Sequence, residues 1–143
     1  MSVIVTENGF SPDRWKRGFC APQDVDDNPA SGSGANGVEL EPDSDPVLLL
    51  GRFDRIGLIR ITFPSHTDGR GFSLAARLRQ LGYCGCLRAR GPLIPDQFAI
   101  ARRAGFDEVE IPDEIAARQP AAQWLQAAAS AGDSYQDRLR RSA

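Results

Sequence analysis

The sequence has little cysteine and little histidine, and these scarcities exclude several kinds of site. Its 143 residues contain three cysteines and one histidine. An odd number of cysteines argues against a disulfide framework, and three thiols fall short of the four-cysteine set that usually holds an iron–sulfur cluster. A single histidine excludes a histidine-rich metal site. We therefore expect no metal centre, and the sequence indicates no particular cofactor.

Long hydrophobic runs, sorting signals and nucleotide-binding motifs are also missing. No apolar run approaches the length of a membrane-spanning helix, and the N-terminus lacks the basic and apolar regions of a secretory signal. We therefore expect a cytoplasmic protein without a membrane segment. There is no P-loop, no Gly-x-Gly-x-x-Gly and no nucleophile elbow. No basic stripe with interleaved aromatic residues occurs, which argues against a nucleic-acid partner.

Length and composition predict one globular domain. Hydrophobic residues make up 41% of the chain and charged residues 25%, which is normal for a protein that buries its own core. Charge is uneven, because no basic residue lies between Arg17 and Arg52 although this segment is rich in aspartate and glutamate. We divide the single α/β domain, residues 1–143, into an N-terminal hairpin arm at 1–19, a flexible acidic loop at 20–37, an α/β core at 38–131 and a polar tail at 132–143.

Strands and helices alternate through the predicted core. A β-branched run predicts a strand at 56–63, and shorter segments between turn and helix signals predict strands at 38–41, 84–90 and 106–111. Helical periodicity bounded by proline and glycine predicts helices at 47–53, 72–81 and 95–104, a short one from 112, and a last one at 120–129. Gly51 weakens the first of these, and a strand at 46–50 is the alternative there. Such alternation requires right-handed crossovers. We therefore predict an α/β fold with a small parallel sheet of about four βα units, either an open sheet or a half-barrel.

An N-terminal β-hairpin is predicted to precede this core. Residues 2–6 have the β-branched pattern of a strand, and Asn8-Gly9 follows them before Phe10. An Asn-Gly pair between two such runs is a strong hairpin signal. A parallel sheet has two exposed edges, and such edges are usually paired or covered. We expect the hairpin to cover one edge, and a homodimer contact or the C-terminal helix to cover the other.

The most informative stretch of the chain is Phe-Pro-Ser-His-Thr-Asp-Gly-Arg-Gly at residues 63–71. It joins a predicted strand to a predicted helix, so Gly69, Arg70 and Gly71 bring backbone N–H groups, a positive helix end and a guanidinium together. That combination is the chemistry of an anion site. The alternative is that the glycines only supply turn geometry and Asp68 only caps the helix.

Further polar side chains are predicted to follow the neighbouring strands at the same edge of the sheet. Arg88 and Arg90 share one strand face by the period of two, and arginine forks suit sulfate, phosphate or carboxylate. Gln97 completes the anion-binding set. The alternative for the arginines is structural pairing with a carboxylate such as Asp68 or Asp96.

The candidate proton-transfer residues are Asp68, His66 and Asp96. His66 has the chemistry of a proton shuttle, but the sequence fixes no nucleophile or acid beside it. Asp96 lies in the first turn of a predicted helix, where a carboxylate also stabilises the positive helix end. Cys84 and Cys86 are expected on one face of a strand, either as small buried thiols or as a redox or sulfur-handling pair.

Several short motifs in combination resemble the bacterial family called domain of unknown function 934. They are Thr-Asp-Gly-Arg-Gly at 67–71, Leu-Arg-Ala at 87–89, Asp-Gln at 96–97 and Gly-Phe-Asp at 105–107. The similarity extends over nearly the whole chain, including the N-terminal hairpin. The family usually has an acidic residue at the position of Cys86. Its genes lie beside those of assimilatory sulfite reductase, and it is often labelled an oxidoreductase of sulfite reduction.

The resemblance implies an accessory protein of sulfite reduction, and hence of sulfur assimilation and cysteine biosynthesis. Such a protein would bind sulfite reductase or its electron donor, an anionic metabolite at the strand C-terminal ends, or both. The alternative is a small enzyme, an oxidoreductase acting on an anionic sulfur or phosphorylated compound. In that case Arg70, Arg88 and Arg90 would hold the substrate's charge. A purely structural module is the third interpretation.

Overall fold

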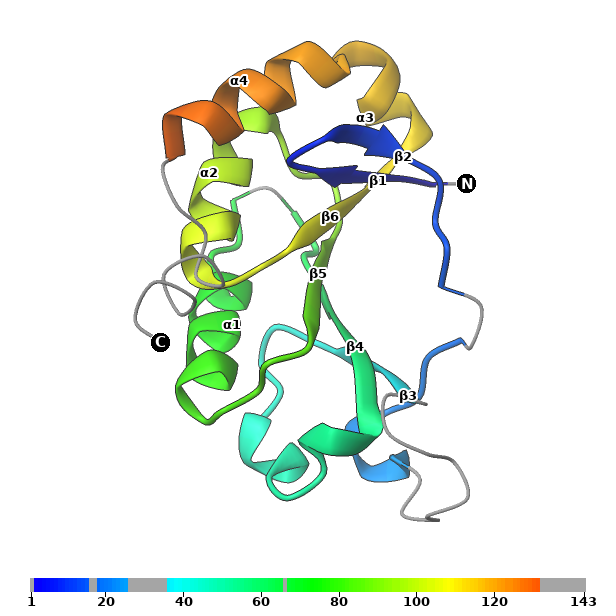
Figure 1. The fold of residues 1–143 in the computed structure, drawn as a ribbon, viewed down its shortest axis with the longest axis vertical. Coiled ribbons are helices and arrows are strands. Elements are labelled where there is room, and N and C mark those ends of the chain that lie inside the picture. The colour runs from blue at the N-terminus through cyan, green and yellow to red at the C-terminus, as the bar shows by residue number, and fades with distance from the viewer. Residues whose placement is uncertain (1, 16–17, 26–35, 66, 132–143) are drawn as a thin grey trace.

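The computed structural model describes residues 2–15, 18–25, 36–65 and 67–131, with side chains as far as residue 127. Six strands form one sheet in the order β2-β1-β6-β5-β4-β3 (Figure 1). The strands are β1 (Ser2–Thr6), β2 (Gly9–Ser11), β3 (Asn36–Leu40), β4 (Ile56–Thr62), β5 (Cys86–Arg90) and β6 (Glu108–Pro112). The helices are α1 (Arg70–Gln80), α2 (Pro95–Ala104), α3 (Asp113–Arg118) and α4 (Ala121–Ala131), with 3₁₀ turns η1 (Pro22–Asp24), η3 (Pro46–Leu49) and η4 (Phe53–Arg55).

The four parallel strands lie in the order of the sequence, β3-β4-β5-β6. The β4–α1–β5 and β5–α2–β6 crossovers therefore move in the same direction and, if right-handed as is usual, leave their helices on the same face. Figure 1 shows α1 and α2 on one side of the sheet. The parallel part of the sheet is therefore singly wound, because a doubly wound sheet reverses its strand order. The predicted α/β fold is confirmed, and the sheet is mixed because β1 runs antiparallel to β6.

The core lies between this sheet face and the helices. Ile59 and Ile61 of β4 are fully buried, as are Leu87 and Ala89 of β5. Alternate residues of a strand point to opposite faces, so these side chains all face the helices. Each large apolar side chain buried in this way contributes about 1.5–3 kcal/mol. The opposite sheet face carries the charged side chains described below.

The N-terminal hairpin covers one edge of the parallel strands, as predicted. β1 pairs with β6, and β2 pairs with β1 around the turn at Gly9, whose φ of 106° favours glycine. At the other edge Cys20 forms a parallel bridge with Val38 of β3. The C-terminal helix does not take that place, because α4 packs against α2 and β2. A homodimer contact stays a prediction.

The chain between these two edges crosses the face of the sheet that has no helices (Figure 1). Its described residues, 12–15 and 18–20, are called the strap below. Asp13 pairs with Arg88 of β5, and Phe19 stacks on Arg60 of β4. A Cβ atom at Gly37 of β3 would collide with the Gly18 carbonyl oxygen, so the strap and β3 are in close contact. The predicted acidic loop falls largely on residues 26–35, which lie outside the described residues, as does the predicted polar tail.

Several elements differ from the sequence-based expectation, and three of the differences change an interpretation. α1 begins at Arg70, two residues before the expected start. The expected helix at 47–53 is replaced by η3 and η4, with Gly51 between them at a φ of 82°. β5 begins at Cys86, so the exposed Cys84 lies outside the strand and the two thiols do not share a strand face. The reason is the preceding turn, in which the Tyr83 hydroxyl donates to the Cys86 carbonyl at 2.8 Å.

Arg79 is a charged residue inside the core, and its side chain has no solvent exposure. Its guanidinium donates to the carbonyl oxygens of Tyr83, Gly85 and Gly105 at 2.7–3.0 Å. It also binds the Asp107 carboxylate at 2.9 Å. Carbonyl groups at helix ends and turns need such partners when they are buried. Arg79 therefore joins the end of α1 to the turns that precede β5 and β6.

Candidate functional site

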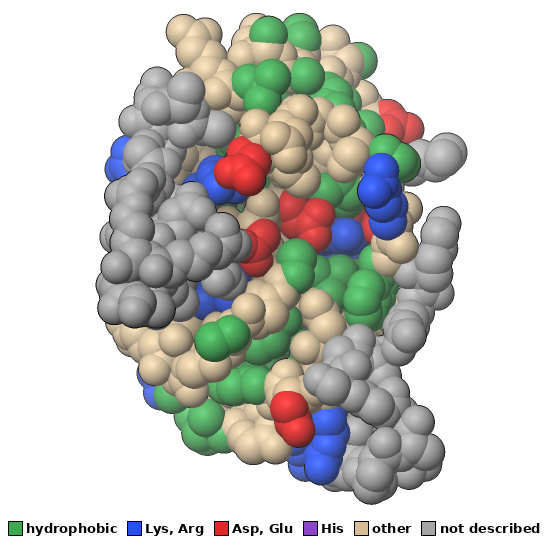
Figure 2. Space-filling model, in the orientation of Figure 1, with side chains coloured by type: hydrophobic (Ala, Val, Ile, Leu, Met, Phe, Trp, Pro, Cys, Tyr) green, Lys and Arg blue, Asp and Glu red, His purple; other side chains and the backbone are tan. Residues whose placement is uncertain are grey.

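The sheet face opposite α1 and α2 carries charged side chains on four neighbouring strands, with two arginines on the middle strands and a glutamate on each outer strand. Arg60 of β4 donates to Glu39 of β3 at 2.8 Å and to Glu110 of β6 at 3.1 Å. Arg88 of β5 donates to the same Glu110 at 3.0 Å. We call Glu39, Arg60, Arg88 and Glu110 the charged row. Figure 2 shows acidic and basic side chains side by side in a hollowed region at the centre of the view.

Asp13 and Glu108 extend the pairing of Arg88. Asp13 of the strap accepts from Arg88 Nη2 at 3.1 Å, and Glu108 lies 3.6 Å from the same nitrogen. Burial acts to raise the pKa of Asp13, but hydrogen bonds from the Trp15 N–H and from Arg88 outweigh it, and the pKa is lowered. Burial likewise acts against the charge of Arg88, but Glu108 and Asp13 raise its pKa overall. Arg88 is thus held as a cation by a cluster of carboxylates.

The other end of the row has similar electrostatics. Burial acts to raise the pKa of Glu39, but hydrogen bonds from Arg60 and from the Thr62 hydroxyl lower it. The Phe19 ring lies over the guanidinium of Arg60 with 3.7 Å between Cζ and the ring centroid. The Nε–H groups of Arg60 and Arg88 are buried without an acceptor among the described residues. Such groups are uncommon in folded proteins, so the row is not a fully satisfied network.

A hollow of about 220 Å³ lies where β4, β5 and β6 end. Thr62, Arg90 and Gly91 line it together with Glu110 and Pro112. The Arg90 side chain is 49% exposed, and it reaches Glu39 and Glu110 only at 3.4 Å each. The C-terminal ends of parallel strands are where α/β proteins usually bind ligands. Arg90 is therefore positioned to meet a ligand from solvent.

The Gly-Arg-Gly turn is closed by its own carboxylate. The Arg70 guanidinium donates to both Asp68 oxygens, with 2.7 Å from Nη2 to Oδ2, and the Arg70 N–H donates to Oδ1 at 3.1 Å. The hydrogen bonds from Arg70 lower the pKa of Asp68. A Cβ atom at Gly71 would collide with the Phe63 ring, whereas one at Gly69 would meet open space. Gly71 thus allows close packing, and Asp68 occupies the place of an external anion.

The remaining candidates are dispersed. Gln97 accepts from the Ile94 N–H at 3.1 Å and so caps the start of α2. Asp96 is exposed in the first turn of the same helix. His66 lies outside the described residues. The structure brings Arg88 and Arg90 together through Glu110, while Arg70 pairs with Asp68.

The sequence did not identify the ion-pair partners of Arg88 and Arg90. The missed residues are the acids Asp13, Glu39, Glu108 and Glu110, and the arginine Arg60, which binds two of these acids. The available signal was the period of two, since Glu108 and Glu110 share a strand face just as Arg88 and Arg90 do. Asp68 and Asp96, the partners considered from the sequence, do not contact Arg88. No group of three or more metal-binding side chains occurs among the described residues.

A protein-family comparison matches residues 37–143 to the family described as "Bacterial protein of unknown function (DUF934)". The chain belongs to this family. No curated protein and no solved structure matches the chain. The DUF934 match contains β3 to β6 and therefore the whole charged row. The strap and the hairpin precede the matched residues, so the likeness expected there is not part of the match. In the described part of this DUF934 protein, no helix has the length and apolar character needed to span a membrane.

Proposed function

We propose that this protein is a cytoplasmic accessory protein of assimilatory sulfite reduction. In this proposal it binds a small anion of the sulfite or sulfate class at the strand C-terminal ends and delivers or senses it beside a reductase partner. Family membership supports the proposal through the gene context that the resemblance implies. The exposure of Arg90 in the hollow is the structural observation that carries it.

The contrast between the arginines of this face is the main argument. Arg88 is 3% exposed and is held by three carboxylates, whereas Arg90 is 49% exposed and has only long contacts. The hollow of about 220 Å³ has room for a tetrahedral oxyanion. A guanidinium matches two oxygens of such an anion, and Thr62 also lines the hollow. If Arg90 turns to an anion, Glu110 keeps Arg60 and Arg88 as partners.

The neighbouring Glu110 does not prevent anion binding. Its carboxylate lies 3.0–3.4 Å from the guanidinium groups of Arg60, Arg88 and Arg90, and it accepts from the Ser2 hydroxyl. Its charge is therefore shared among several donors, and Arg90 is the most exposed of the three. The candidate acids Asp68 and Asp96 do not line this hollow. Binding is thus better supported here than proton transfer.

A reductase partner would contact a different part of the molecule. Val47, Leu48 and Leu50 are 44%, 52% and 46% exposed around η3. Contiguous exposed apolar side chains are typical of protein-binding surfaces. We include this apolar surface in the proposal as the contact for the reductase, its electron donor or a second copy of the chain. Leu48→Glu should weaken co-purification with sulfite reductase from the native host without weakening anion binding.

The anion proposal is tested by thermal shift and isothermal calorimetry with sodium sulfite, sulfate and phosphate, using chloride to match ionic strength. A ligand specific to the native state raises the melting temperature by mass action. Arg90→Gln should abolish the rise. Arg77→Gln is the matched control, because Arg77 is an exposed arginine of α1. Equal anion responses in wild type and Arg90→Gln would contradict the proposal.

A further inference from the structure

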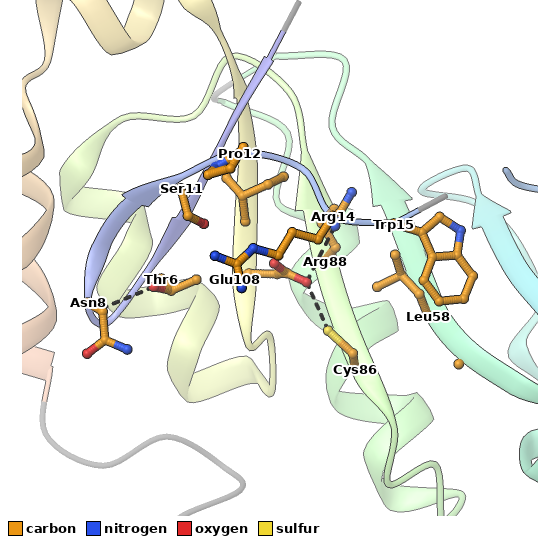
Figure 3. A pocket seen from close by; sticks show the side chains of 12 residues that line it. Thr6, Asn8, Ser11, Pro12, Arg14, Trp15, Leu58, Cys86, Arg88 and Glu108 are labelled. Carbon is orange, nitrogen blue, oxygen red and sulfur yellow. Dashed lines mark hydrogen bonds and ion pairs between the residues drawn. The ribbon is translucent and has the colours of Figure 1, made fainter. Parts of the chain in front are cut away.

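A second and larger cavity lies beneath the strap, away from the strand C-terminal ends. Its volume is about 480 Å³, which is in the range of small-molecule sites. It is enclosed by the strap, the hairpin and the first residues of β4, β5 and β6 (Figure 3). Leu58, Cys86 and Glu108 form its sheet side, while Arg14 and Trp15 line it from the strap. The side chains that line this cavity differ from those of the Arg90 hollow.

The roof of this cavity is fixed to the sheet. Asp13 binds both the Trp15 N–H at 2.9 Å and Arg88 at 3.1 Å. The Trp15 indole N–H donates to the Gly18 carbonyl at 2.7 Å, and Gly18 lies against β3 at Gly37. The strap is therefore held on both sides of Arg14. A cavity held open in this way costs less ordering free energy when a ligand binds.

Arg14 is the arginine of the cavity lining that no carboxylate binds in the described part of the chain. Arg88 is neutralised by Asp13 and Glu110. The charge of Glu108 faces Arg88, and Glu108 also accepts from the Cys86 thiol at 3.0 Å. Arg14 is exposed and has no ion-pair partner in the described part of the chain. A ligand here meets one available guanidinium.

The rest of the lining is mixed. Ile4, Leu58 and Pro12 provide apolar surface, and the half-buried Trp15 ring adds an aromatic wall. Burial and the neighbouring Glu108 raise the pKa of Cys86, so its sulfur stays a neutral thiol in this wall. An inorganic anion would leave these apolar groups uncovered. A ligand with an apolar part and one anionic group would cover the apolar wall and also pair with Arg14.

We propose that this cavity binds a small organic anion, a carboxylate or sulfonate carried on an apolar or aromatic body, with its charged group at Arg14. The inference does not depend on the anion proposed for the Arg90 hollow. It rests on a different cavity, different residues and a different ligand chemistry.

The two tryptophans allow a direct test. Trp15 lines the cavity, whereas Trp124 is fully buried against Phe98 of α2. The protein labelled with 5-fluorotryptophan should give two fluorine resonances, and Trp15→Phe assigns them. Titration with p-toluenesulfonate or benzoate should shift the Trp15 resonance and leave the Trp124 resonance in place. Inorganic sulfate and neutral benzyl alcohol should shift Trp15 much less.

Three variants complete the test. Arg14→Gln should weaken p-toluenesulfonate binding by about three- to tenfold, since an exposed charge contributes on the order of 1 kcal/mol. Ser11→Phe, which fills the cavity from β2, should abolish the Trp15 shift while the Trp124 resonance reports an intact fold. Arg90→Gln should change nothing. An unmoved Trp15 resonance, or equal binding of benzyl alcohol and p-toluenesulfonate, would overturn the proposal.

Discussion

Arg88 Nη2 lies 3.1 Å from Asp13 Oδ1, although 75 positions of the sequence separate the two residues. This ion pair fixes the strap to the middle of the sheet face. Arg88 is almost fully buried, while Asp13 is about one-third exposed. The pair therefore joins a buried cation to a segment that reaches solvent, and it closes one side of the cavity beneath the strap.

Asp13→Asn should loosen the strap without unfolding the sheet. Arg88 keeps Glu110 and Glu108, so the expected loss in the free energy of unfolding is about 1 kcal/mol. Urea denaturation measures this loss, and hydrogen exchange should rise at Trp15. Glu41→Gln, at an exposed position beyond β3, is the control and should change neither. Unchanged exchange in Asp13→Asn would show that the pair does not hold the strap.

Low pH should destabilise the folded protein, because it protonates Glu39 of the charged row and Asp13 of the strap. The pKa values of Asp13 and Glu39 are lower in the folded protein than their ordinary values of 3.8 and 4.5. Their stabilising contribution is therefore complete above those ordinary values and is lost as the pH falls through the lower folded-state pKa values. Melting temperatures measured from neutral pH downward should fall less steeply in Glu39→Gln than in wild type. Glu114→Gln, exposed on α3, should keep the wild-type slope.

Arg79→Met should be strongly destabilising. The substitution removes the donors that satisfy three backbone carbonyls and Asp107. Loss of one partner of a buried charge network costs about 3–5 kcal/mol. Arg77→Met, two residues earlier on the exposed side of α1, should change stability by no more than about 0.5 kcal/mol. Similar denaturation midpoints for the two variants would refute the assigned role of Arg79.

The two glycines of the Gly-Arg-Gly turn should respond differently to alanine. Gly71→Ala places a Cβ against the Phe63 ring, and such overpacking costs about 1–3 kcal/mol. Gly69 has a φ of −91° and open space around it, so Gly69→Ala should be nearly neutral. Calorimetric melting of both variants checks this difference. A reversed order would argue that backbone freedom at Gly69, and not packing at Gly71, explains the motif.

The thiols should differ in reactivity. Cys84 is exposed, whereas burial and then Glu108 raise the pKa of the half-buried Cys86. Limited iodoacetamide treatment at mildly alkaline pH should therefore label Cys84 well before Cys86, as peptide mass spectrometry can measure. Glu108→Gln should speed labelling of Cys86, and Glu114→Gln should not. Faster labelling of Cys86 than of Cys84 in wild type would contradict this assignment.

Local patterns predicted the elements of the fold better than its site. Proline and glycine punctuation located α2 between Pro95 and Ala104, because capping and helix termination depend on neighbouring residues. The direction of successive crossovers depends on how helices pack, so the sequence left the open sheet and the half-barrel equally allowed. Strand period predicted that Arg88 and Arg90 share a face, and the structure pairs Arg88 with carboxylates, which was the alternative to anion binding. The Arg88 partner Asp13 was missed because the strap has no periodic signal.

The pairing of β1 with β6 has a consequence for the order of assembly. Ser2 and Glu110 are hydrogen-bonded across 108 positions of the chain, so the first strand of this sheet in chain order pairs with the last one described. On the ribosome the hairpin has no sheet edge to join until β6 has emerged. Sheet completion must therefore follow translation of nearly the whole domain, and non-local pairing of this kind slows folding. Truncation before Glu108, which removes β6, would leave both the hairpin and β5 with unpaired edges.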